Sequence, residues 1–372
     1  MAQAGEPFRA DHVGSLIRPS RLVEAHKAHE AGRLSADYYE ALLQEETTRV
    51  VRMQEDLGLR VVTDGEFNRQ GWQRDFLLSF ENVELIESRV PVKFHSETGV
   101  TLRAPPTMQV AGKLSRPGPI FVDDFKFLKS IARATPKITI PSPTILHFRG
   151  GRDVIDRDAY PDMDGFFADL ARVYREEIAD LISAGCRYLQ IDEVNFAYLC
   201  DPALRDHVRS LGEDPDQLPH TYADLLNKLV EGAPDDMLFG MHLCRGNFGG
   251  AWVAEGGYEP VAEVLFNAIN IQRYFMEYDS PRAGSFDVLR HLPKGKQVVL
   301  GLVTTKKSAM ETKDEIKRRV EDASRFCSLD QLALSPQCGF ASGVGGETMT
   351  LEEEEQKLRL VVEVAREIWG TA

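Results

Sequence analysis

Short apolar runs alternate with longer amphipathic stretches along most of this chain, and the alternation limits the folds open to it. Most of the runs are too continuously apolar for a half-exposed sheet, which indicates strands that are buried on both faces. Residues 166–184 show the intervening pattern, because apolar side chains recur there at helical spacing before a glycine stop at Gly185. The repeating unit is therefore strand, helix, strand, with the strands parallel.

Eight such runs in order predict an α/β fold of the (β/α)8, or TIM, barrel type. The runs are residues 8–13, 60–64, 137–140, 187–192, 237–242, 270–278, 297–303 and 331–334. We expect residues 1–372 to form a single TIM-barrel domain, since the length suits one large barrel with insertions. An open doubly wound sheet is the alternative, but no Gly-x-Gly-x-x-Gly turn follows the first run.

Residues 80–120 interrupt the alternation after the second predicted strand. They contain three short segments of β-forming residues that are separated by turn residues, which is typical of a β-hairpin. We expect this inserted hairpin to act as a lid and not as a separate domain.

Charge and composition exclude several classes of partner. The chain has 44 Lys and Arg against 58 Asp and Glu, a formal charge of −14, which argues against binding the phosphate backbone of nucleic acid. Residues 1–7 contain no apolar run, and no stretch approaches the roughly eighteen apolar residues of a membrane span. We therefore expect no membrane association and a cytoplasmic location. The five cysteines do not suggest a disulfide framework, so thiols stay free for metal.

Polar side chains gather at the C-terminal ends of the predicted strands, which is the catalytic rim of this fold. Two of them have simpler interpretations: Asp64 could cap a turn, and His147 could be a hydrogen-bonded pocket histidine. In chain order the set is His12, Ser15, Asp64, Glu66, His147, Asp192, Glu193, His242, Cys244, Glu277 and Cys338.

Four members of this set, His242, Cys244, Glu277 and Cys338, predict a zinc site. One imidazole and two thiolates suit a borderline-soft divalent ion, and the carboxylate can complete the tetrahedron or give way to a substrate thiol. The residues are dispersed along the chain, as happens when a barrel enzyme places each ligand on a different strand. A zinc ion that only staples the barrel is the non-enzymatic alternative, and it predicts four fixed ligands with no affinity for thiols.

Several segments together resemble the catalytic barrel of the cobalamin-independent methionine synthase family. The match spans nearly the whole chain and is closest in kind to short, single-barrel members. The segments are His12-Val13-Gly14-Ser15, Asp64-Gly65-Glu66, Gln190-Ile191-Asp192-Glu193, His242-Leu243-Cys244, Glu277-Tyr278-Asp279-Ser280 and Cys338-Gly339. The resemblance implies a zinc-dependent S-methyltransferase that converts homocysteine to methionine.

The resemblance also assigns roles to residues. It implies that Zn²⁺, held by the four ligands named above, binds the homocysteine thiol and keeps it as the thiolate nucleophile, since a free thiol is mostly protonated at neutral pH. It implies a substrate pocket in which His12, Gly14 and Ser15 surround the carboxylate, while Glu66 and Asp192 pair with the ammonium group. Asp192 is thereby also a catalytic candidate.

Two positions depart from the family pattern and concern the methyl donor. Phe148 stands where folate-dependent members have a tryptophan that stacks on the pterin, and Lys307 stands where they have a histidine that protonates the leaving group. A lysine would act as an acid if burial lowered its pKa. The donor is therefore open between 5-methyltetrahydrofolate and another carrier such as methylcobalamin, with a corrinoid protein or a second copy of the chain as partner.

Two other enzyme classes stay open. A thiol alkyltransferase of the epoxyalkane:coenzyme M type shares the metal site, but its sulfonate substrate calls for cationic residues in place of Glu66 and Asp192. A metal-free barrel of the uroporphyrinogen decarboxylase type needs basic residues for propionate groups and no thiolate cluster. Metal content separates these alternatives.

Overall fold

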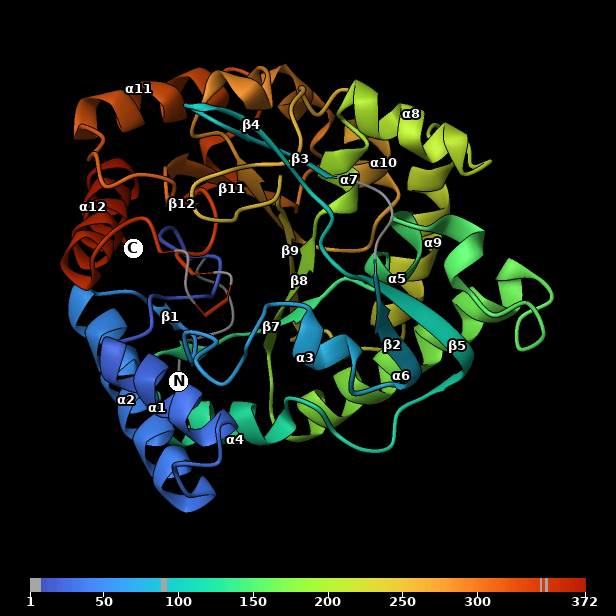
Figure 1. Cartoon of the computed structure of the whole chain (residues 1–372). Coiled ribbons are helices and arrows are strands. Elements are labelled where there is room, and N and C mark those ends of the chain that lie inside the picture. Colours follow the sequence, from blue (N-terminus) through green and yellow to red (C-terminus); the bar gives the residue numbers. More distant parts are fainter. Residues whose placement is uncertain (1–7, 88–91, 342, 345–346) are drawn as a thin grey trace.

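The computed structural model describes residues 8–87, 92–341, 343–344 and 347–372. Its centre is a six-stranded parallel sheet whose strands lie side by side in chain order (Figure 1). Every residue of the first, second, fourth and sixth of these strands is buried, as expected for strands covered on both faces. The strands are β7 (Ile138–Pro141), β8 (Tyr188–Glu193), β9 (Leu238–Leu243), β10 (Arg273–Glu277), β11 (Gln297–Val303) and β12 (Leu332–Pro336).

Two short segments extend the sheet at its edges. β1 (Val61–Val62) pairs in parallel with β6 (Thr135–Pro136), which leads directly into β7. At the opposite edge Ala10 forms a parallel bridge with Leu334 of β12. Parallel neighbours thus run from residue 10 through the central sheet to β1, and the protein has an α/β fold.

The two outer segments also contact each other. Thr63 Oγ1 donates a hydrogen bond to Gly14 O at 2.6 Å, and the Leu16 N–H donates to Gly65 O at 3.0 Å. Two hydrogen bonds, and no strand ladder, therefore join them in the described residues. A small buried cluster also draws one side chain from each of six strand segments, namely Val13, Val61, Tyr188, Phe275, Val299 and Ala333.

The first two predicted strands are shorter than expected. Residues 8–13 form a single bridge instead of a ladder, because side chains bind their carbonyls: Lys137 Nζ donates to His12 O, and Gln190 Nε2 donates to Val13 O. The second predicted strand, 60–64, is reduced to β1. The other six predicted strands coincide with β7 to β12, with ends that differ by at most three residues.

Helices surround the strands in Figure 1 and supply the connections between them. The helix expected over 166–184 is α6, and its start is fixed by Asp162, whose side chain accepts the Gly165 N–H. The helices are α1 (Ser20–Glu30), α2 (Ala36–Leu57), α3 (Arg74–Leu77), α4 (Val122–Ile131), α5 (Ile145–Phe148), α6 (Met163–Ser183), α7 (Asn195–Tyr198), α8 (Pro202–Ser210), α9 (Leu218–Val230), α10 (Ala262–Asn267), α11 (Lys313–Ser324) and α12 (Leu351–Trp369).

The segment expected as an inserted hairpin, 80–120, contains two antiparallel strand pairs. β2 (Glu81–Ile86) pairs with β5 (Thr107–Ser115), and β3 (Val92–Ser96) pairs with β4 (Gly99–Arg103); residues 88–91 lie outside the described residues. The β3–β4 pair is attached to the segment after β9, because the His95 N–H donates to Trp252 O at 2.7 Å and the Trp252 N–H donates to His95 O at 2.9 Å.

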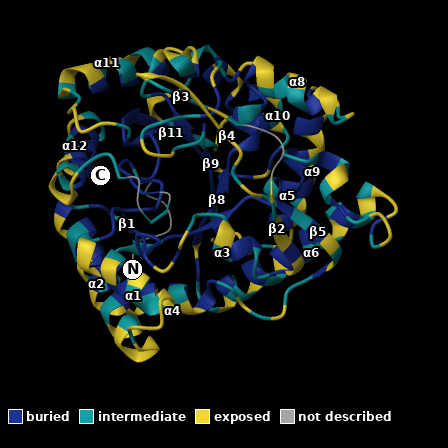
Figure 2. Cartoon of the chain, in the orientation of Figure 1, coloured by how far each residue is buried: buried dark blue, intermediate teal, exposed yellow. Residues whose placement is uncertain are grey.

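Burial follows this arrangement, with buried strands at the centre and exposed positions on the outward faces of the helices (Figure 2). One buried acid lies in the C-terminal helix. Glu354 is 1% exposed, and its Oε1 accepts the Ile17 N–H at 2.9 Å. Burial raises the pKa of this carboxyl group to about 8, although the Ile17 hydrogen bond opposes the rise.

We predict that Glu354→Gln stabilises the protein increasingly as pH rises from 5 to 8. In the unfolded chain this carboxyl ionises near pH 4.5, whereas in the folded chain it stays protonated to about pH 8, so wild type loses stability across that window. The loss approaches about 1.4 kcal/mol per pH unit. Urea unfolding of both proteins at several pH values measures it. Glu352→Gln, on the exposed face of the same helix, is the control, and an equal response of the two variants would refute the explanation.

Candidate metal centre and substrate pocket

Four potential metal ligands meet at the C-terminal ends of β9, β10 and β12. His242 is the penultimate residue of strand β9, and Cys244 is the first residue after that strand. Glu277 ends β10, and Cys338 follows β12 by two residues. One ligand atom from each residue lies within 4.8 Å of all the others. His242, Glu277 and Cys338 are buried, whereas Cys244 is partly exposed. The structure therefore brings together the four residues that the sequence predicted as metal ligands.

Strand pairing holds these residues in place. In the parallel ladders His242 lies beside Asp192 of β8, and β10 pairs with β9 through the residue before Glu277. The Cys244 N–H donates to Glu193 O at 2.8 Å, and the Arg245 N–H donates to Glu277 Oε1 at 3.0 Å. The backbone of the loop after β9 thus fixes both the cysteine and the carboxylate that faces it.

The geometry and donor types fit zinc. The Cys244 and Cys338 sulfurs are 3.6 Å apart, close to the roughly 3.8 Å between two thiolates of a tetrahedral site with Zn–S bonds of about 2.3 Å. The His242 ring interacts with the Cys338 thiol and has no oxygen or nitrogen partner among the described residues. Two sulfurs, one imidazole and one carboxylate form a donor set that zinc accepts.

The two thiols differ in their affinity for a proton. The hydrogen bond from Cys244 and the neighbouring His242 ring lower the pKa of Cys338 to about 5, despite its burial. The same sulfur–sulfur contact, followed by burial, raises the pKa of Cys244 well above its usual value. Because zinc binds cysteine as the thiolate, metal binding would release any proton that the pair holds.

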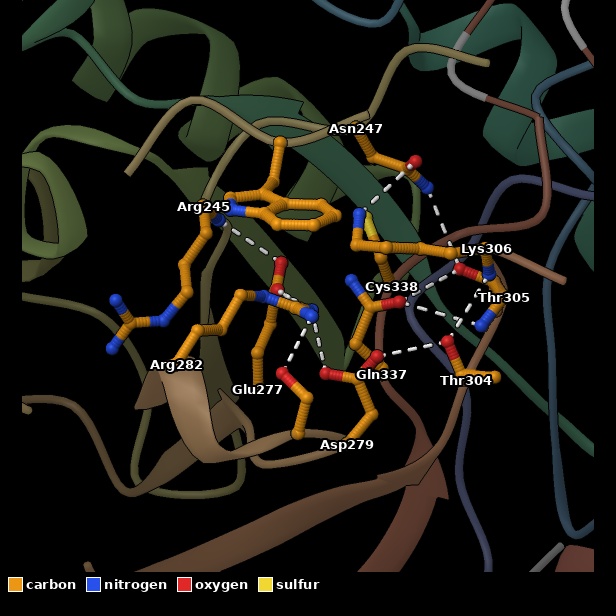
Figure 3. Close-up of polar contacts among 12 residues, drawn as sticks. Arg245, Asn247, Glu277, Asp279, Arg282, Thr304, Thr305, Lys306, Gln337 and Cys338 are labelled. Carbon is orange, nitrogen blue, oxygen red and sulfur yellow. Dashed lines mark hydrogen bonds and ion pairs between the residues drawn. The ribbon is translucent and has the colours of Figure 1, made fainter. Parts of the chain in front are cut away.

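Two basic side chains offset the negative charge of this group (Figure 3). Arg282 Nη2 lies 3.4 Å from Glu277 Oε2 and 2.6 Å from Asp279 Oδ1. Lys306 Nζ donates to Asn247 Oδ1 at 3.3 Å. Burial raises the pKa of Glu277, but Lys306, Arg282 and His242 together outweigh it, and the net pKa is lowered. Glu277 is therefore a carboxylate at neutral pH.

Lys307 does not join the four-residue group. Its side chain is 56% exposed and pairs with Glu97 at 3.0 Å, whereas the adjacent Lys306 acts electrostatically on both Cys244 and Glu277. Lys307 as the reacting lysine therefore stays a prediction, and the adjacent Lys306 is the lysine whose charge acts on the four-residue group. Both lysines and Arg282 line a cavity of about 710 Å³, together with the tip of the β3–β4 pair and residues of α11.

Phe148 is not open to a ligand in this structure. It is 5% exposed and packs against Tyr198 at a ring-centroid distance of 5.8 Å. His147 beside it makes a hydrogen bond of 2.9 Å with the Tyr222 hydroxyl through Nδ1, and its Nε2 lies 3.5 Å from Glu213, which agrees with the interpretation as a hydrogen-bonded pocket histidine.

Two buried acids, Glu66 and Asp192, lie next to the four-residue group, and the charge of Glu66 acts on Asp192. Glu66 Oε1 accepts from Thr139 Oγ1 at 2.8 Å, and Arg69 lies 3.6 Å from its other oxygen. Burial and then the charge of Glu66 raise the pKa of Asp192 to about 7, while His242, Gln190 and Arg69 oppose the rise. The backbone of Glu66 has a positive φ of 59°, and Asp64 caps this turn by accepting the Glu66 N–H at 2.9 Å.

Gly14 and Ser15 border the same region. Gly14 has φ of 141°, and a Cβ atom there would lie 2.9 Å from Glu66 Oε1 and 2.7 Å from Thr139 Cγ2. A Cβ atom on Gly339, next to Cys338, would lie 1.9 Å from Ser15 Oγ. Gly14 therefore allows the backbone to approach Glu66 closely, and Gly339 allows Ser15 to lie against the cysteine loop.

His12 is buried beside Lys137 and is a neutral imidazole, since burial and then the charge of Lys137 lower its pKa to about 4. Sequence reasoning missed Arg69, Thr139 and Lys306, which no strand-end motif marks. Gln190 could have been found from the sequence, because it precedes Asp192 by two residues and therefore lies on the same face of β8. Within the described residues, no helix is long and apolar enough to cross a membrane.

Comparisons with known proteins agree on one family. The family model described as "Cobalamin-independent synthase, Catalytic domain" matches residues 8–367. The uncharacterized protein YxjH of Bacillus subtilis is 42% identical over 369 residues, which cover 99% of this chain and 96% of that protein. A 5-methyltetrahydropteroyltriglutamate–homocysteine methyltransferase of Bradyrhizobium diazoefficiens is 26% identical over 97% of this chain, which spans 42% of that protein.

Solved structures agree with the sequence comparisons. A Listeria monocytogenes protein assigned to the vitamin-B12 independent methionine synthases has a TM-score of 0.76 and 34% identity, with 98% of each chain covered. A B12-independent methionine synthase from Shewanella sp. W3-18-1, described in complex with selenomethionine, has a TM-score of 0.73 and 20% identity, again with 98% of each chain covered, and it shares the fold.

We predict that the purified protein binds one zinc ion per chain and that Cys244→Ser and Cys338→Ser each weaken binding by more than about 100-fold. Loss of a residue that merely supports a ligand already costs about 10- to 100-fold in metal affinity, and loss of a ligand costs more. Zinc titration against a competing chelator measures this. Cys327→Ser is the matched control, since Cys327 lies outside the group and should bind as wild type. Equal affinity in all four proteins would contradict the assignment.

Proposed function

The chain belongs to the cobalamin-independent methionine synthase family, a methyltransferase family, and on this premise we propose that it methylates the thiol of homocysteine in a zinc-dependent reaction that yields methionine. The observation that supports this most directly is the meeting of His242, Cys244, Glu277 and Cys338 within 4.8 Å. These four residues would hold the zinc ion, which when bound supplies a site that keeps the substrate sulfur as a thiolate at neutral pH.

The surrounding residues adjust the charge of that site. Cys244, Cys338 and Glu277 contribute negative charge, and Lys306 and Arg282 offset part of it. A site that is not strongly negative accepts a further anionic sulfur at lower electrostatic cost. The proposal therefore assigns Lys306, and not Lys307, as the basic residue that assists the reaction.

The acids next to the metal group would recognise the amino-acid part of the substrate. Asp192 and Glu66 are buried acids, the charge of Glu66 disfavours ionisation of Asp192, and an ammonium group between them would relieve this cost. Gly14 and Ser15 would receive the substrate carboxylate, with His12 beneath them. A thiol with a sulfonate, as in coenzyme M, would meet two like charges here, which disfavours the epoxyalkane-type alternative. The thiol cluster disfavours the decarboxylase alternative.

The transfer itself is an in-line displacement at a methyl carbon. The thiolate sulfur forms the new S–C bond while the bond between the methyl group and its carrier breaks, and the electron pair leaves with the carrier. When the carrier is a folate, a proton must reach its nitrogen. The cavity of about 710 Å³ is the proposed donor site, and its basic lining residues are Arg282, Lys306, Lys307, Arg318 and Arg319. Of these, Lys306 acts electrostatically on the Cys244 sulfur. Because Phe148 is covered by Tyr198, a donor would stack elsewhere.

The proposal includes the architecture around the site. We propose that the eight strand segments of this single domain close into a (β/α)8 barrel, which is supported by the 14–16 and 63–65 hydrogen bonds and by the six-strand side-chain cluster that includes Val13 and Phe275. The insertion would act as a lid, since its β3–β4 tip borders the donor cavity and Glu97 pairs with Lys307 across it.

We predict that the zinc-loaded protein forms methionine from L-homocysteine when given the correct methyl carrier. Parallel assays with 5-methyltetrahydrofolate, its triglutamate and methylcobalamin, each followed by quantification of methionine, identify that carrier. Asp192→Asn should lower kcat/KM by at least about tenfold, because loss of a charged hydrogen-bond partner costs 1.5 kcal/mol or more. Alkylation of coenzyme M in preference to homocysteine would refute the proposed substrate.

We also predict different effects for the two adjacent lysines. Lys306→Met removes a charge that acts on Cys244 and Glu277 and should reduce kcat/KM by about tenfold or more, an effect of roughly 1.4 kcal/mol. Lys307→Met breaks an exposed ion pair and should stay within about twofold of wild type. The opposite order would restore Lys307 as the reacting lysine.

A further inference from the structure

A fully buried ion cluster lies in the interior next to the substrate pocket. Lys137 Nζ is 2.8 Å from Asp11 Oδ1, and Arg273 approaches Asp11 Oδ2 at 3.4 Å. The Tyr188 hydroxyl donates to Asp11 Oδ2 at 2.8 Å. All four side chains are at most 1% exposed. The proposed chemistry uses none of them, although buried charges are costly unless they are paired and hydrogen-bonded.

Gln190 links this cluster to the pocket. Its Oε1 accepts from Lys137 Nζ at 3.0 Å, while its Nε2 donates to Val13 O at 2.5 Å and to Asp192 Oδ1 at 2.7 Å. The amide is 0% exposed, and both of its ends are engaged. Gln190 and Asp192 lie on the same face of β8, two residues apart, as does Tyr188.

The orientation of this amide is determined by chemistry and is not a free choice. An ammonium group donates hydrogen bonds and accepts none, so the Gln190 atom that faces Lys137 must be the carbonyl oxygen. The amide nitrogen must then face Asp192, where it can only donate. Asp192 Oδ1 is thereby held as an acceptor, and the carboxylate is fixed in one orientation.

The hydrogen bond from Gln190 leaves the second oxygen of the Asp192 carboxylate available to a ligand. In the part of the chain that the structure describes, Asp192 forms no ion pair, and its side-chain hydrogen bond is the one from Gln190. Its neighbour Glu66, by contrast, is held by Thr139 and Arg69. With Oδ1 occupied by the amide, Oδ2 remains to receive a cationic group of the ligand.

We propose that Gln190 is a positioning residue that sets the Asp192 carboxylate for the ammonium group of an amino-acid thiol, and that Lys137 fixes the orientation of Gln190. The inference rests on the proposed function, because it concerns how that substrate is selected. It predicts that Gln190 governs discrimination between thiols with and without an ammonium group, and not thiol affinity as such. A residue that only fills space would affect both kinds of thiol equally.

The test compares two thiols on zinc-loaded protein by calorimetric titration. L-Homocysteine carries the ammonium group, and 4-mercaptobutanoate has the same thiol and carboxylate without it. Gln190→Met keeps the length of the side chain and removes both hydrogen bonds to Asp192 and Lys137. We expect it to weaken homocysteine binding by about 10- to 100-fold while 4-mercaptobutanoate changes by less than about threefold, with zinc content unchanged.

Two further variants keep the outcome decisive. Gln190→Glu can still accept from Lys137 but offers Asp192 no amide donor, so it should show the same selective loss even where the methionine variant folds poorly. Tyr188→Phe removes a hydrogen bond to the far side of Asp11 and should keep the wild-type preference. Equal weakening of both thiols in the Gln190 variants, or an unchanged preference, would overturn the inference while the proposed function stood. Absence of any preference in wild type would instead remove the proposed amino-acid pocket, and the inference with it.

Discussion

The parallel register of β8, β9 and β10 is the constraint on which the rest of the site depends. It sets Asp192 beside His242 and brings the end of β10 to the loop after β9, so that Glu277 and Cys244 face each other. A shift of one residue in either ladder would turn each of these side chains to the opposite face of its strand. The dispersed ligands can form one group because backbone hydrogen bonds hold the ends of β9 and β10 side by side, and the ladders through β11 to β12 bring Cys338 to the same edge of the sheet.

Charged side chains form three neighbouring layers in the interior of the molecule. Arg273, Asp11 and Lys137 form an ion-paired group of two cations and one anion in the interior, Asp192 and Glu66 lie beyond it, and the thiol-rich group lies next to them. Gln190 is the neutral side chain that connects the first layer to the second. Because the neutral Gln190 amide stands between Lys137 and Asp192, the interior group can orient Asp192 without an ion pair to it, which leaves the carboxylate available to a cationic ligand.

The sequence was most informative where periodicity and residue type agree. Strands β7 to β12 followed from continuous apolar runs, and the four potential ligands followed from their places at strand ends. The first strand was overestimated, because its carbonyls bind Lys137 and Gln190 side chains, a long-range effect that local pattern does not encode. Arg69 likewise reaches Glu66 from a turn, and the choice between Lys306 and Lys307 depended on loop geometry that spacing alone does not give.

The measurement that tests the central claim most directly is zinc-edge X-ray absorption of the zinc-loaded protein before and after L-homocysteine is added. Thiol activation by His242, Cys244, Glu277 and Cys338 predicts a first shell with two sulfur neighbours that gains a third when the substrate thiol binds. A first shell that stays unchanged at saturating homocysteine would contradict the account and leave zinc, if present, with a purely structural role.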